Sequence, residues 1–310
     1  MIKSINNLNS EKKNFLIFLI IVIGIILRLM SPKLGHHTTD IEWWLFINDI
    51  YSLNGDFYGT GVNVYAPGFI SILWFLDNLP FFDLDNLNAF RFKLIIFLTI
   101  TDVLIFILLL KRFSLLIGVL FFFNPISIFI TGFHNQFDNI AILIGLFSVI
   151  IFEKRNKYSF YFSMLLLGLS LIIKHILFIF PIWLAIKEKI ITRKLLIILI
   201  PYSLFVISFT PFLPHQFDSI ISDVFLYQSF SNGPFWSIFT PQFLGSYIGY
   251  KNLFIIALIL LGFYLDKKSI MDTFLIYLIA VVTFSSAVAN QYLAIPLVAI
   301  AVYWNPYFLF

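Results

Sequence analysis

The feature that most restricts the fold of this chain is a series of long apolar blocks separated by short hydrophilic segments. Two examples are FLIFLIIVIGIIL at residues 15–27 and VLIFILLL at residues 103–110. In the whole chain 60% of the residues are hydrophobic and 12% are charged, whereas soluble domains have roughly 25% charged residues. Blocks of about 20 apolar residues can cross a bilayer as helices, and these blocks lack the alternation of membrane β-barrels. We therefore expect an all-α polytopic membrane protein.

The apolar blocks predict a bundle of about 10–11 transmembrane helices in a single domain that covers residues 1–310. No internal repeat or hydrophilic domain is recognisable. No small-residue cleavage site follows the first block, so we expect it to be retained as a span. The chain has no cysteine, which excludes disulfides and thiolate chemistry. The expected spans lie near residues 15–30, 66–82, 92–110, 114–131, 139–152, 158–173, 176–186, 195–211, 253–265, 270–288 and 293–304.

The charges of the hydrophilic connectors predict the orientation of the chain. By the positive-inside rule, short basic connectors and the N-terminus are expected in the cytoplasm. Connectors poor in Lys and Arg and rich in Asp, His, Asn and aromatic residues are expected outside. This scheme places Lys111 and Arg112 outside if residues 66–82 and 92–110 both cross, unless one helix before residue 134 is partial or re-entrant. The basic connectors are Lys12-Lys13, Arg91 with Lys93, Lys154-Arg155 with Lys157, Lys187 to Lys194, and Lys267-Lys268.

The first polar stretch, GHHTTDIEWWLFINDIY at residues 35–51, concentrates histidines, acids and a tryptophan pair after the first apolar block. Apolar residues at near-helical spacing predict a helix over residues 40–53, and its aromatic residues favour a position in the outer membrane interface. Asp40 follows two threonines at the expected helix start, where an acid is a common cap. The stretch is interpreted either as an interfacial belt with solvated acids or as part of a site with His36, His37, Asp40 and Glu42.

Two further stretches place polar side chains next to expected spans. DFYGTGVNVYAPGF at residues 56–69 leads through Tyr65 and Pro67 into the next span, and proline at a helix start is a common structural feature. GFHNQFDN at residues 132–139 brings five hydrogen-bonding side chains to the mouth of an apolar helix. If they are buried there they need partners, and in a solvated turn they need none. Asp138 is also well placed as a helix cap. The candidates from these stretches are Tyr65, His134, Gln136 and Asp138.

Polar residues also interrupt two later apolar blocks. Lys174 and His175 lie within LSLIIKHILFIFP at residues 169–181. An outward-facing lysine there either snorkels to the interface or binds an anionic lipid head group. SSAVANQYLAIP at residues 285–296 holds an amide pair and a tyrosine, which serve packing or sugar binding equally well: Asn290, Gln291 and Tyr292. Asp102 and Arg91 are further charges in or beside apolar blocks, interpreted as structural partners.

All of these clusters are expected on the same side of the membrane, and scattered structural polar residues would not segregate in this way. A shared site would combine carboxylates, histidines, amides, aromatic rings and a lysine. Amides and aromatic rings suit sugar hydroxyls and ring faces, a lysine suits a phosphate, and a carboxylate suits a base. The residues therefore predict a site for a sugar bound beside a lipid phosphate.

The order of these motifs resembles the GT-C superfamily of polyprenyl-phosphate-sugar-dependent glycosyltransferases. The resemblance rests on an acidic outer loop with an aromatic helix, Tyr-Ala-Pro at residues 65–67, FHNQFDNIAILIG at 133–145, GLSLIIKHILFIFP at 168–181 and NQYLAIPLVAI at 290–300. The chain is most similar to the branch with the glucosyltransferases of N-glycan precursor assembly, the GPI mannosyltransferase and their prokaryotic relatives. Either Asp40 or Glu42 matches the acid of the first loop, and Asp40 is preferred because it begins the interfacial helix.

The resemblance implies an inverting glycosyltransferase that moves a monosaccharide from a dolichyl- or undecaprenyl-phosphate donor to a hydroxyl of a glycan or glycolipid acceptor. It implies Asp40 as general base and Lys174 with His175 as ligands of the departing lipid phosphate. Sugar or acceptor binding falls to the other candidates, with Glu42 and Asp138 as alternative bases. The branch works without a metal, although Asp40 and Glu42 keep a divalent cation conceivable.

The expected place of action is the external face of the cell membrane, or the lumenal face of the endoplasmic reticulum in a eukaryote. The bilayer is an expected partner and nucleic acid is not. Two other classes of function remain. A lipid-linked-sugar flippase or transporter would also need outward polar clusters, together with charges at mid-membrane, for which Asp102 is the candidate. A structural subunit would use the polar loops to bind a partner protein.

Overall fold

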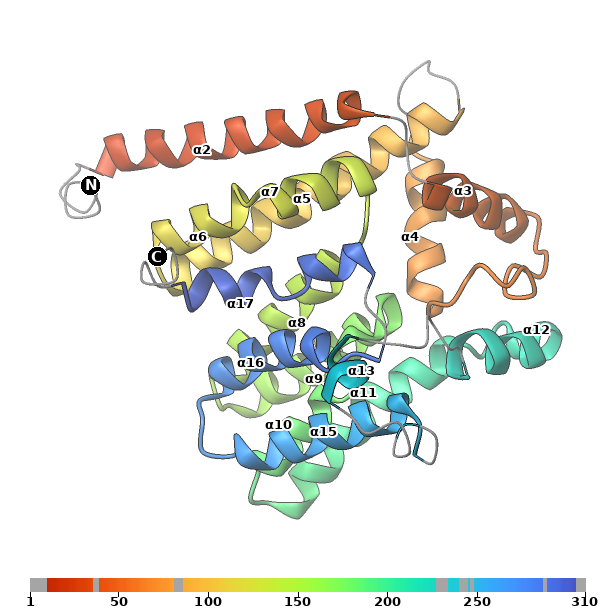
Figure 1. Cartoon of the computed structure of the whole chain (residues 1–310), viewed down its shortest axis with the longest axis vertical. Coiled ribbons are helices and arrows are strands. Elements are labelled where there is room, and N and C mark those ends of the chain that lie inside the picture. The colour runs from red at the N-terminus through yellow and green to blue at the C-terminus, as the bar shows by residue number, and fades with distance from the viewer. Residues whose placement is uncertain are drawn as a thin grey trace.

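The computed structural model describes residues 10–35, 39–80, 86–226, 234–239, 245, 248–286 and 289–304. All regular secondary structure within these residues is helical, without a strand (Figure 1), so the expected all-α fold is confirmed. Three 3-10 helices are η1 Ser31–Leu34, η3 His175–Leu177 and η5 Asn290–Ala294, and two π-helices are η2 Ile130–His134 and η4 Ile221–Phe225. The α-helices are α2 Ser10–Met30, α3 Thr39–Ser52, α4 Pro67–Asp77, α5 Asn86–Arg112, α6 Leu115–Phe122, α7 Pro125–Phe129, α8 Asp138–Phe152, α9 Lys157–Ile173, α10 Phe180–Lys187, α11 Ile191–Ser208, α12 Leu213–Ile220, α13 Pro234–Phe239, α15 Tyr250–Tyr264, α16 Ile270–Thr283 and α17 Leu297–Val302.

Three helical segments of the described residues are long and apolar enough to cross a bilayer: Ser10–Leu34, Leu87–Arg112 and Ile191–Ser208. A fourth is obtained if the segments Leu115–Phe122 and Pro125–His134, which are bent by 49° relative to each other, form one broken span. The described residues also contain shorter apolar helices of 10–17 residues. These lengths support the coarse expectation of a membrane protein built from several apolar helices.

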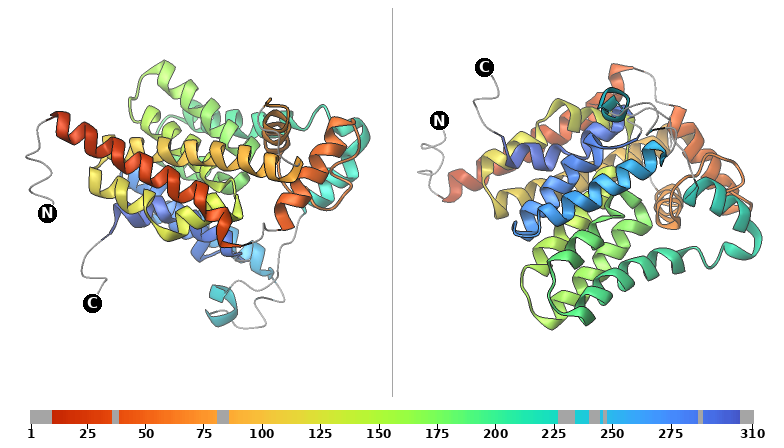
Figure 2. Two further views of the ribbon diagram at one scale, coloured as in Figure 1. Left: turned by 90° about the horizontal axis from the view of Figure 1, so that it is seen from above. Right: turned by 60° about the horizontal axis from the view of Figure 1, so that its bottom comes forward.

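Helix α8 lies in the middle of the bundle and begins directly after the polar turn at residues 134–137 (Figures 1 and 2). It packs against α5, α9 and α16, and three successive residues, Ile140 to Ile142, are buried. Gly145 permits this close packing, because a Cβ atom there would lie 2.2 Å from a methyl carbon of Leu177. In contrast, α2 lies along the edge of the bundle, where the apolar side chains of Phe15 and Phe18 are exposed.

One end of the bundle collects most of the basic connectors. Arg112 at the end of α5 forms an ion pair with Glu153 after α8, with 2.7 Å between Nη2 and Oε2. This contact brings Lys111 and Arg112 to the basic residues 154–157. Lys187 Nζ donates to the backbone carbonyls of residues 265, 266 and 268 at 2.6–2.9 Å, which joins two further basic connectors. We call these four groups the basic end; the turns after α5 and α15 lie toward the left of Figure 1.

The opposite end of α5 holds Arg91, whose Nε donates to Asn135 Oδ1 at 3.1 Å. Arg91 and Lys93 therefore lie away from the basic end, contrary to the expectation that they belong with the other basic connectors. The reason is the length of α4. Its 11 residues measure roughly 16 Å at about 1.5 Å per residue, short of the roughly 30 Å of a bilayer core. Helix α4 is therefore shorter than the full span expected over residues 66–82, which agrees with the alternative of a partial helix before residue 134.

Candidate functional site

The turn between η2 and α8 forms the base of the candidate site and has a fixed shape. Asn135 adopts the left-handed conformation (φ 60°), which asparagine tolerates better than most residues. Its side-chain amide donates to the carbonyl oxygens of Thr131 and Gly132 at 3.0 and 3.2 Å, and its oxygen accepts from Arg91. Both ends of the Asn135 side chain are thus bonded. The fixed conformation of Asn135 therefore holds the next two residues of the turn, Gln136 and Phe137, in defined directions.

Gln136 joins this turn to the acidic start of α3. Its Nε2 donates to Asp40 Oδ2 at 2.6 Å, although the two residues are 96 positions apart in the sequence. Aromatic packing supports this contact, because Phe137 stacks on Phe69 of α4 at 3.6 Å and meets the edge of Trp44 of α3 at 5.5 Å. Gln136 is buried, whereas Asp40 is half-buried. The carboxylate of Asp40 is therefore both positioned by the protein and reachable.

The other end of α3 is fixed to α4. Asn48 Nδ2 donates to Asp77 Oδ2 at 3.0 Å, and Asn48 is completely buried. Lys93 Nζ donates to the carbonyl oxygen of Asp77 at 2.7 Å. Burial raises the pKa of the neighbouring Asp49, and the carboxylate of Asp77 adds to this shift. With both ends held, α3 presents Asp40 to the turn as part of a rigid unit.

Lys174 forms a buried ion pair with Asp138 next to this turn. The distance from Lys174 Nζ to Asp138 Oδ2 is 2.8 Å, and the side chains are 6% and 0% exposed. The ammonium group also lies over the rings of Phe137 and Tyr65, at 4.5 and 5.2 Å from their centroids, where cation–π attraction contributes. The chain is extended at Lys174, between α9 and η3, and this break turns the side chain inward.

Two expectations for these residues were wrong. One alternative for Lys174 was a side chain that snorkels to the membrane interface, but it is buried, because Asp138 neutralises its charge inside the protein. Asp138 was expected as a possible helix cap, but the N-cap position of α8 is Phe137 and no side-chain cap is formed there. The carboxylate of Asp138 is directed to Lys174 instead. The positions of both residues near the turn agree with the sequence-based interpretation.

Several buried oxygen atoms beside the turn have no protein partner. They are Gln136 Oε1, Asp138 Oδ1 and Asn139 Oδ1. A buried acceptor without a hydrogen bond costs about 1–3 kcal/mol, and most native structures avoid it. Three such acceptors thus lie within four consecutive residues of this region. His175 Nδ1 is a further buried nitrogen without a protein partner.

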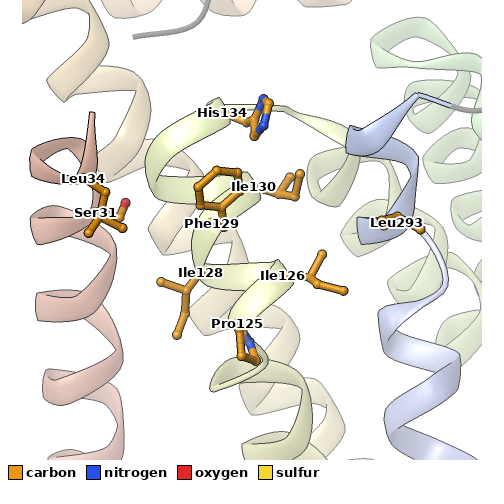
Figure 3. A pocket seen from close by; sticks show the side chains of 9 residues that line it. All are labelled: Ser31, Leu34, Pro125, Ile126, Ile128, Phe129, Ile130, His134 and Leu293. Carbon is orange, nitrogen blue, oxygen red and sulfur yellow. The ribbon is translucent and has the colours of Figure 1, made fainter. Parts of the chain in front are cut away.

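A cavity of about 610 Å³ opens beside His134 (Figure 3). The histidine lies at its upper rim in the figure, and the walls come from η1, from α7 with η2, and from η5. His134 packs against Phe129, with 5.0 Å between ring centroids, and interacts electrostatically with Asp40. The cavity is thus apolar and ends near the polar turn. Its lining is Ser31, Leu34, Pro125, Ile126, Ile128, Phe129, Ile130, His134 and Leu293.

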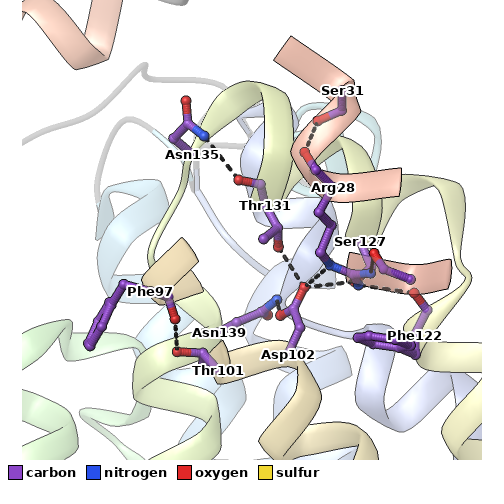
Figure 4. Close-up of polar contacts among 11 residues, drawn as sticks. Arg28, Ser31, Phe97, Thr101, Asp102, Phe122, Ser127, Thr131, Asn135 and Asn139 are labelled. Carbon is purple, nitrogen blue, oxygen red and sulfur yellow. Dashed lines mark hydrogen bonds and ion pairs between the residues drawn. The ribbon is translucent and has the colours of Figure 1, made fainter. Parts of the chain in front are cut away.

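A second buried ion pair, between Arg28 and Asp102, lies behind the turn (Figure 4). Arg28 Nε donates to Asp102 Oδ2 at 2.8 Å, and its remaining nitrogens donate to the carbonyls of Gly24 and Phe122 and to Ser127 Oγ at 3.0–3.1 Å. Asp102 also accepts from Thr131 Oγ1 and Asn139 Nδ2, each at 2.7 Å. The sequence interpretation of Asp102 as the partner of another charge agrees with this network. Arg28 was missed, although it is a charge near the end of an apolar block.

The remaining candidates are distributed around the turn. Glu42 is exposed on α3, and Tyr65 precedes α4. Gln291 and Tyr292 belong to η5, which packs against η2 and α8. His36 and His37 lie outside the described residues, as does the side chain of Asn290. The structure thus brings together Asp40, Tyr65, His134, Gln136, Asp138 and Lys174, with His175 and η5 nearby.

Comparisons with known proteins do not add to this description. No family model, curated protein or solved structure matches the chain. Within the described residues there is no group of three or more His, Cys, Asp or Glu side chains that could hold a metal ion. The chemistry of the site must therefore be inferred from its own residues.

Proposed function

We propose that the chain is a membrane glycosyltransferase that uses a polyprenyl-phosphate-linked monosaccharide as donor and a glycan or glycolipid hydroxyl as acceptor. Asp40 is the general base of this reaction. The proposal includes a bundle of the GT-C type with about 10–11 membrane segments, an N-terminus in the cytoplasm, and a site at the external or lumenal face.

The observation that carries the proposal is a reachable carboxylate held beside buried, unpartnered acceptors. Asp40 is fixed by Gln136 at 2.6 Å, and the acceptors lie on Gln136, Asp138 and Asn139. Sugar hydroxyls supply hydrogen-bond donors, so a bound sugar would satisfy these oxygens. The half-buried ring of Tyr65, which packs against Phe137, provides apolar ring surface at the same place. Such a combination is suited to carbohydrate and not to an apolar ligand alone.

The cavity beside His134 supports a donor with an apolar tail. Its volume of about 610 Å³ lies within the usual range for ligand pockets. Its apolar walls can accept hydrocarbon, and His134 lies at its rim. A lipid with its tail in this cavity would bring its polar head to the turn. This arrangement suits a lipid-linked sugar better than a water-soluble sugar nucleotide.

In the proposed reaction the acceptor hydroxyl attacks the anomeric carbon of the donor sugar. Asp40 takes the hydroxyl proton, a new glycosidic C–O bond forms, and the bond from the anomeric carbon to the phosphate oxygen breaks with inversion. The polyprenyl phosphate leaves with the electron pair of that bond. Donors near the developing negative charge lower the barrier.

Lys174 and His175 are proposed as those donors. An ammonium group has three N–H donors, and Asp138 accepts from Lys174 at 2.8 Å. A phosphate would therefore be bound by a lysine that is already oriented by Asp138. His134, Gln136, Asp138, Tyr65 and Glu42 are proposed to contact sugar or acceptor, together with His36, His37, Asn290, Gln291 and Tyr292.

The first prediction tests the base. The Asp40→Asn variant keeps the size of the side chain and its contact with Gln136, but it cannot take a proton. Since general base catalysis contributes roughly 10²–10⁴-fold, we expect transfer to fall by about that factor. The assay follows sugar transfer by purified protein from a panel of polyprenyl-phosphate monosaccharides to short glycan and glycolipid acceptors.

The matched control is Asp49→Asn, the same chemical change at an exposed aspartate near the other end of α3. We expect little change in transfer for this variant and unchanged donor binding in both. Equal loss in both variants would contradict the assignment of Asp40 as the base. Donor binding without transfer by the unaltered protein would contradict the enzyme itself and would be followed by a transport assay in vesicles.

A further inference from the structure

The carboxylate of Asp102 receives hydrogen bonds from residues on both sides of the site turn. On one side Thr131 Oγ1 donates to Oδ2, and on the other side Asn139 Nδ2 donates to Oδ1, each at 2.7 Å (Figure 4). Gln136 and Asp138 lie between these two residues in the chain. A single side chain of α5 therefore holds both flanks of the turn.

The position of Asp102 is itself fixed by Arg28. The guanidinium group binds Asp102 Oδ2 and the carbonyl oxygens of Gly24 and Phe122, so it ties α2 and α6 to α5. Gly132 of η2, which leads into the turn, lies so close to the end of α2 and to η1 that a Cβ atom there would be 2.5 Å from the carbonyl oxygen of Arg28 and 1.9 Å from Ser31 Oγ. The turn is thus pressed against α2 on one side and held by Asp102 on the other. Motion of Asp102 would be transmitted to the turn.

We infer that Asp102 is a positioning residue of the candidate site, which acts through Thr131 and Asn139 to hold Gln136 and Asp138 toward Asp40 and Lys174. An effect of Asp102 on catalysis rests on the proposed function. Its effect on the geometry of the turn is independent of that function. Asp102 itself does not touch the site, because its carboxylate is completely buried and occupied by its donors.

A positioning role and a purely stabilising role of Asp102 predict different effects when Thr131 loses its hydroxyl group. A stabilising network would lower the stability of the whole protein and leave the folded site as it is. A positioning network would loosen the turn within the folded protein. Lys174 reports on this, because its amine is buried against Asp138 at the start of α8. Looser contacts at the turn should expose that amine to reagents.

The experiment compares Thr131→Val with Thr101→Val. Both threonines are buried, and both substitutions remove one hydroxyl hydrogen bond. Thr101 lies next to Asp102, but its hydroxyl donates to the carbonyl of Phe97 and has no part in the network (Figure 4). Thr131→Ser restores the hydroxyl and serves as the rescue variant. Asp102→Asn is less suitable, because it leaves the buried charge of Arg28 unpaired and the variant is at risk of not folding.

The readout is the rate of acetylation of Lys174 by acetic anhydride in the full-length protein in detergent, quantified by mass spectrometry of the Lys174 peptide. Hydrogen bonds to charged groups are stronger than average, so we expect an increase of about tenfold in Thr131→Val. Thr101→Val and Thr131→Ser should stay within about twofold of the unaltered protein. Melting temperatures of all four proteins are measured in parallel.

Labelling of Lys174 that follows only the melting temperature, with Thr101→Val and Thr131→Val alike, would overturn the inference. Unchanged labelling in a folded Thr131→Val would do the same. Transfer assays on the same samples separate this inference from the proposed function. If Lys174 labelling behaves as expected and the unaltered protein transfers no sugar, the proposed function fails and the positioning of the turn stands.

Discussion

Two buried ion pairs lie within the same region of the bundle, and they differ in how fully their polar atoms are bonded. In the pair of Arg28 and Asp102, both oxygens of the carboxylate accept hydrogen bonds. The guanidinium group also donates to three other oxygen atoms of the protein. In the pair of Lys174 and Asp138, one carboxylate oxygen is bonded and the other has no protein partner. Neighbouring Gln136 has the same asymmetry.

Under the proposed function, this difference in bonding separates a structural role from a binding role. Burial of charge is costly, and full bonding offsets that cost without leaving capacity for anything else. The Arg28–Asp102 pair therefore resembles an internal joint between helices. The Lys174–Asp138 pair retains free acceptors at the cost of stability, which is a common property of functional sites. The two ion pairs thus differ in their bonding more than in their charge.

The largest effect is expected from breaking the saturated pair. Arg28→Met leaves Asp102 buried without its cation, and loss of one partner of a buried pair costs about 3–5 kcal/mol of unfolding free energy. Replacement of both residues, as Arg28→Met with Asp102→Leu, should recover much of this loss. Denaturation in mixed detergent micelles measures both. A double variant that is as unstable as the single one would show that the network is more than an ion pair.

A smaller effect is expected at the unsaturated region. Gln136→Leu removes the hydrogen bond to Asp40, and bonds to charged groups contribute about 1.5–3 kcal/mol, so we expect about ten- to a hundredfold slower transfer. Stability should change little, because the buried Oε1 without a partner is removed at the same time. Transfer rates and unfolding curves are compared on one preparation. A large loss of stability with normal transfer would reverse the roles assigned to the two regions.

The smallest effect is expected outside both regions, on α5. Thr99 carries a buried hydroxyl without a protein partner, whereas Thr101 donates to the carbonyl of Phe97. Thr99→Val should therefore leave stability unchanged or raise it by up to about 1 kcal/mol, and Thr101→Val should lower it by about that amount. Unfolding free energies of both variants give the cost of one unbonded hydroxyl in this bundle. Equal destabilisation by both variants would show that a buried hydroxyl without a partner has no measurable cost in this bundle.

The sequence was informative wherever the signal is local. Apolar blocks predicted the helical fold, and the concentration of polar residues at 134–139 and at Asp40 pointed to segments that do meet. Pairings across the chain were not predictable in this way. Arg28 and Asp102 are 74 residues apart, and Asp138 and Lys174 are 36 apart. Hydropathy treats a buried, neutralised lysine and a snorkelling lysine alike, so the direction of Lys174 depended on a partner that only the fold reveals.

The short length of α4 has a consequence for the lipids around it. Trp74 and Phe75 are exposed on this helix, and its 11 residues span roughly 16 Å at about 1.5 Å per residue. A bilayer of ordinary thickness cannot match such a helix without thinning locally or drawing lipid head groups inward. Pro67, where α4 begins, follows Tyr65 of the site by two residues. A lipid head group drawn inward along α4 would therefore approach Tyr65, whose ring centroid lies 5.2 Å from the ammonium group of Lys174.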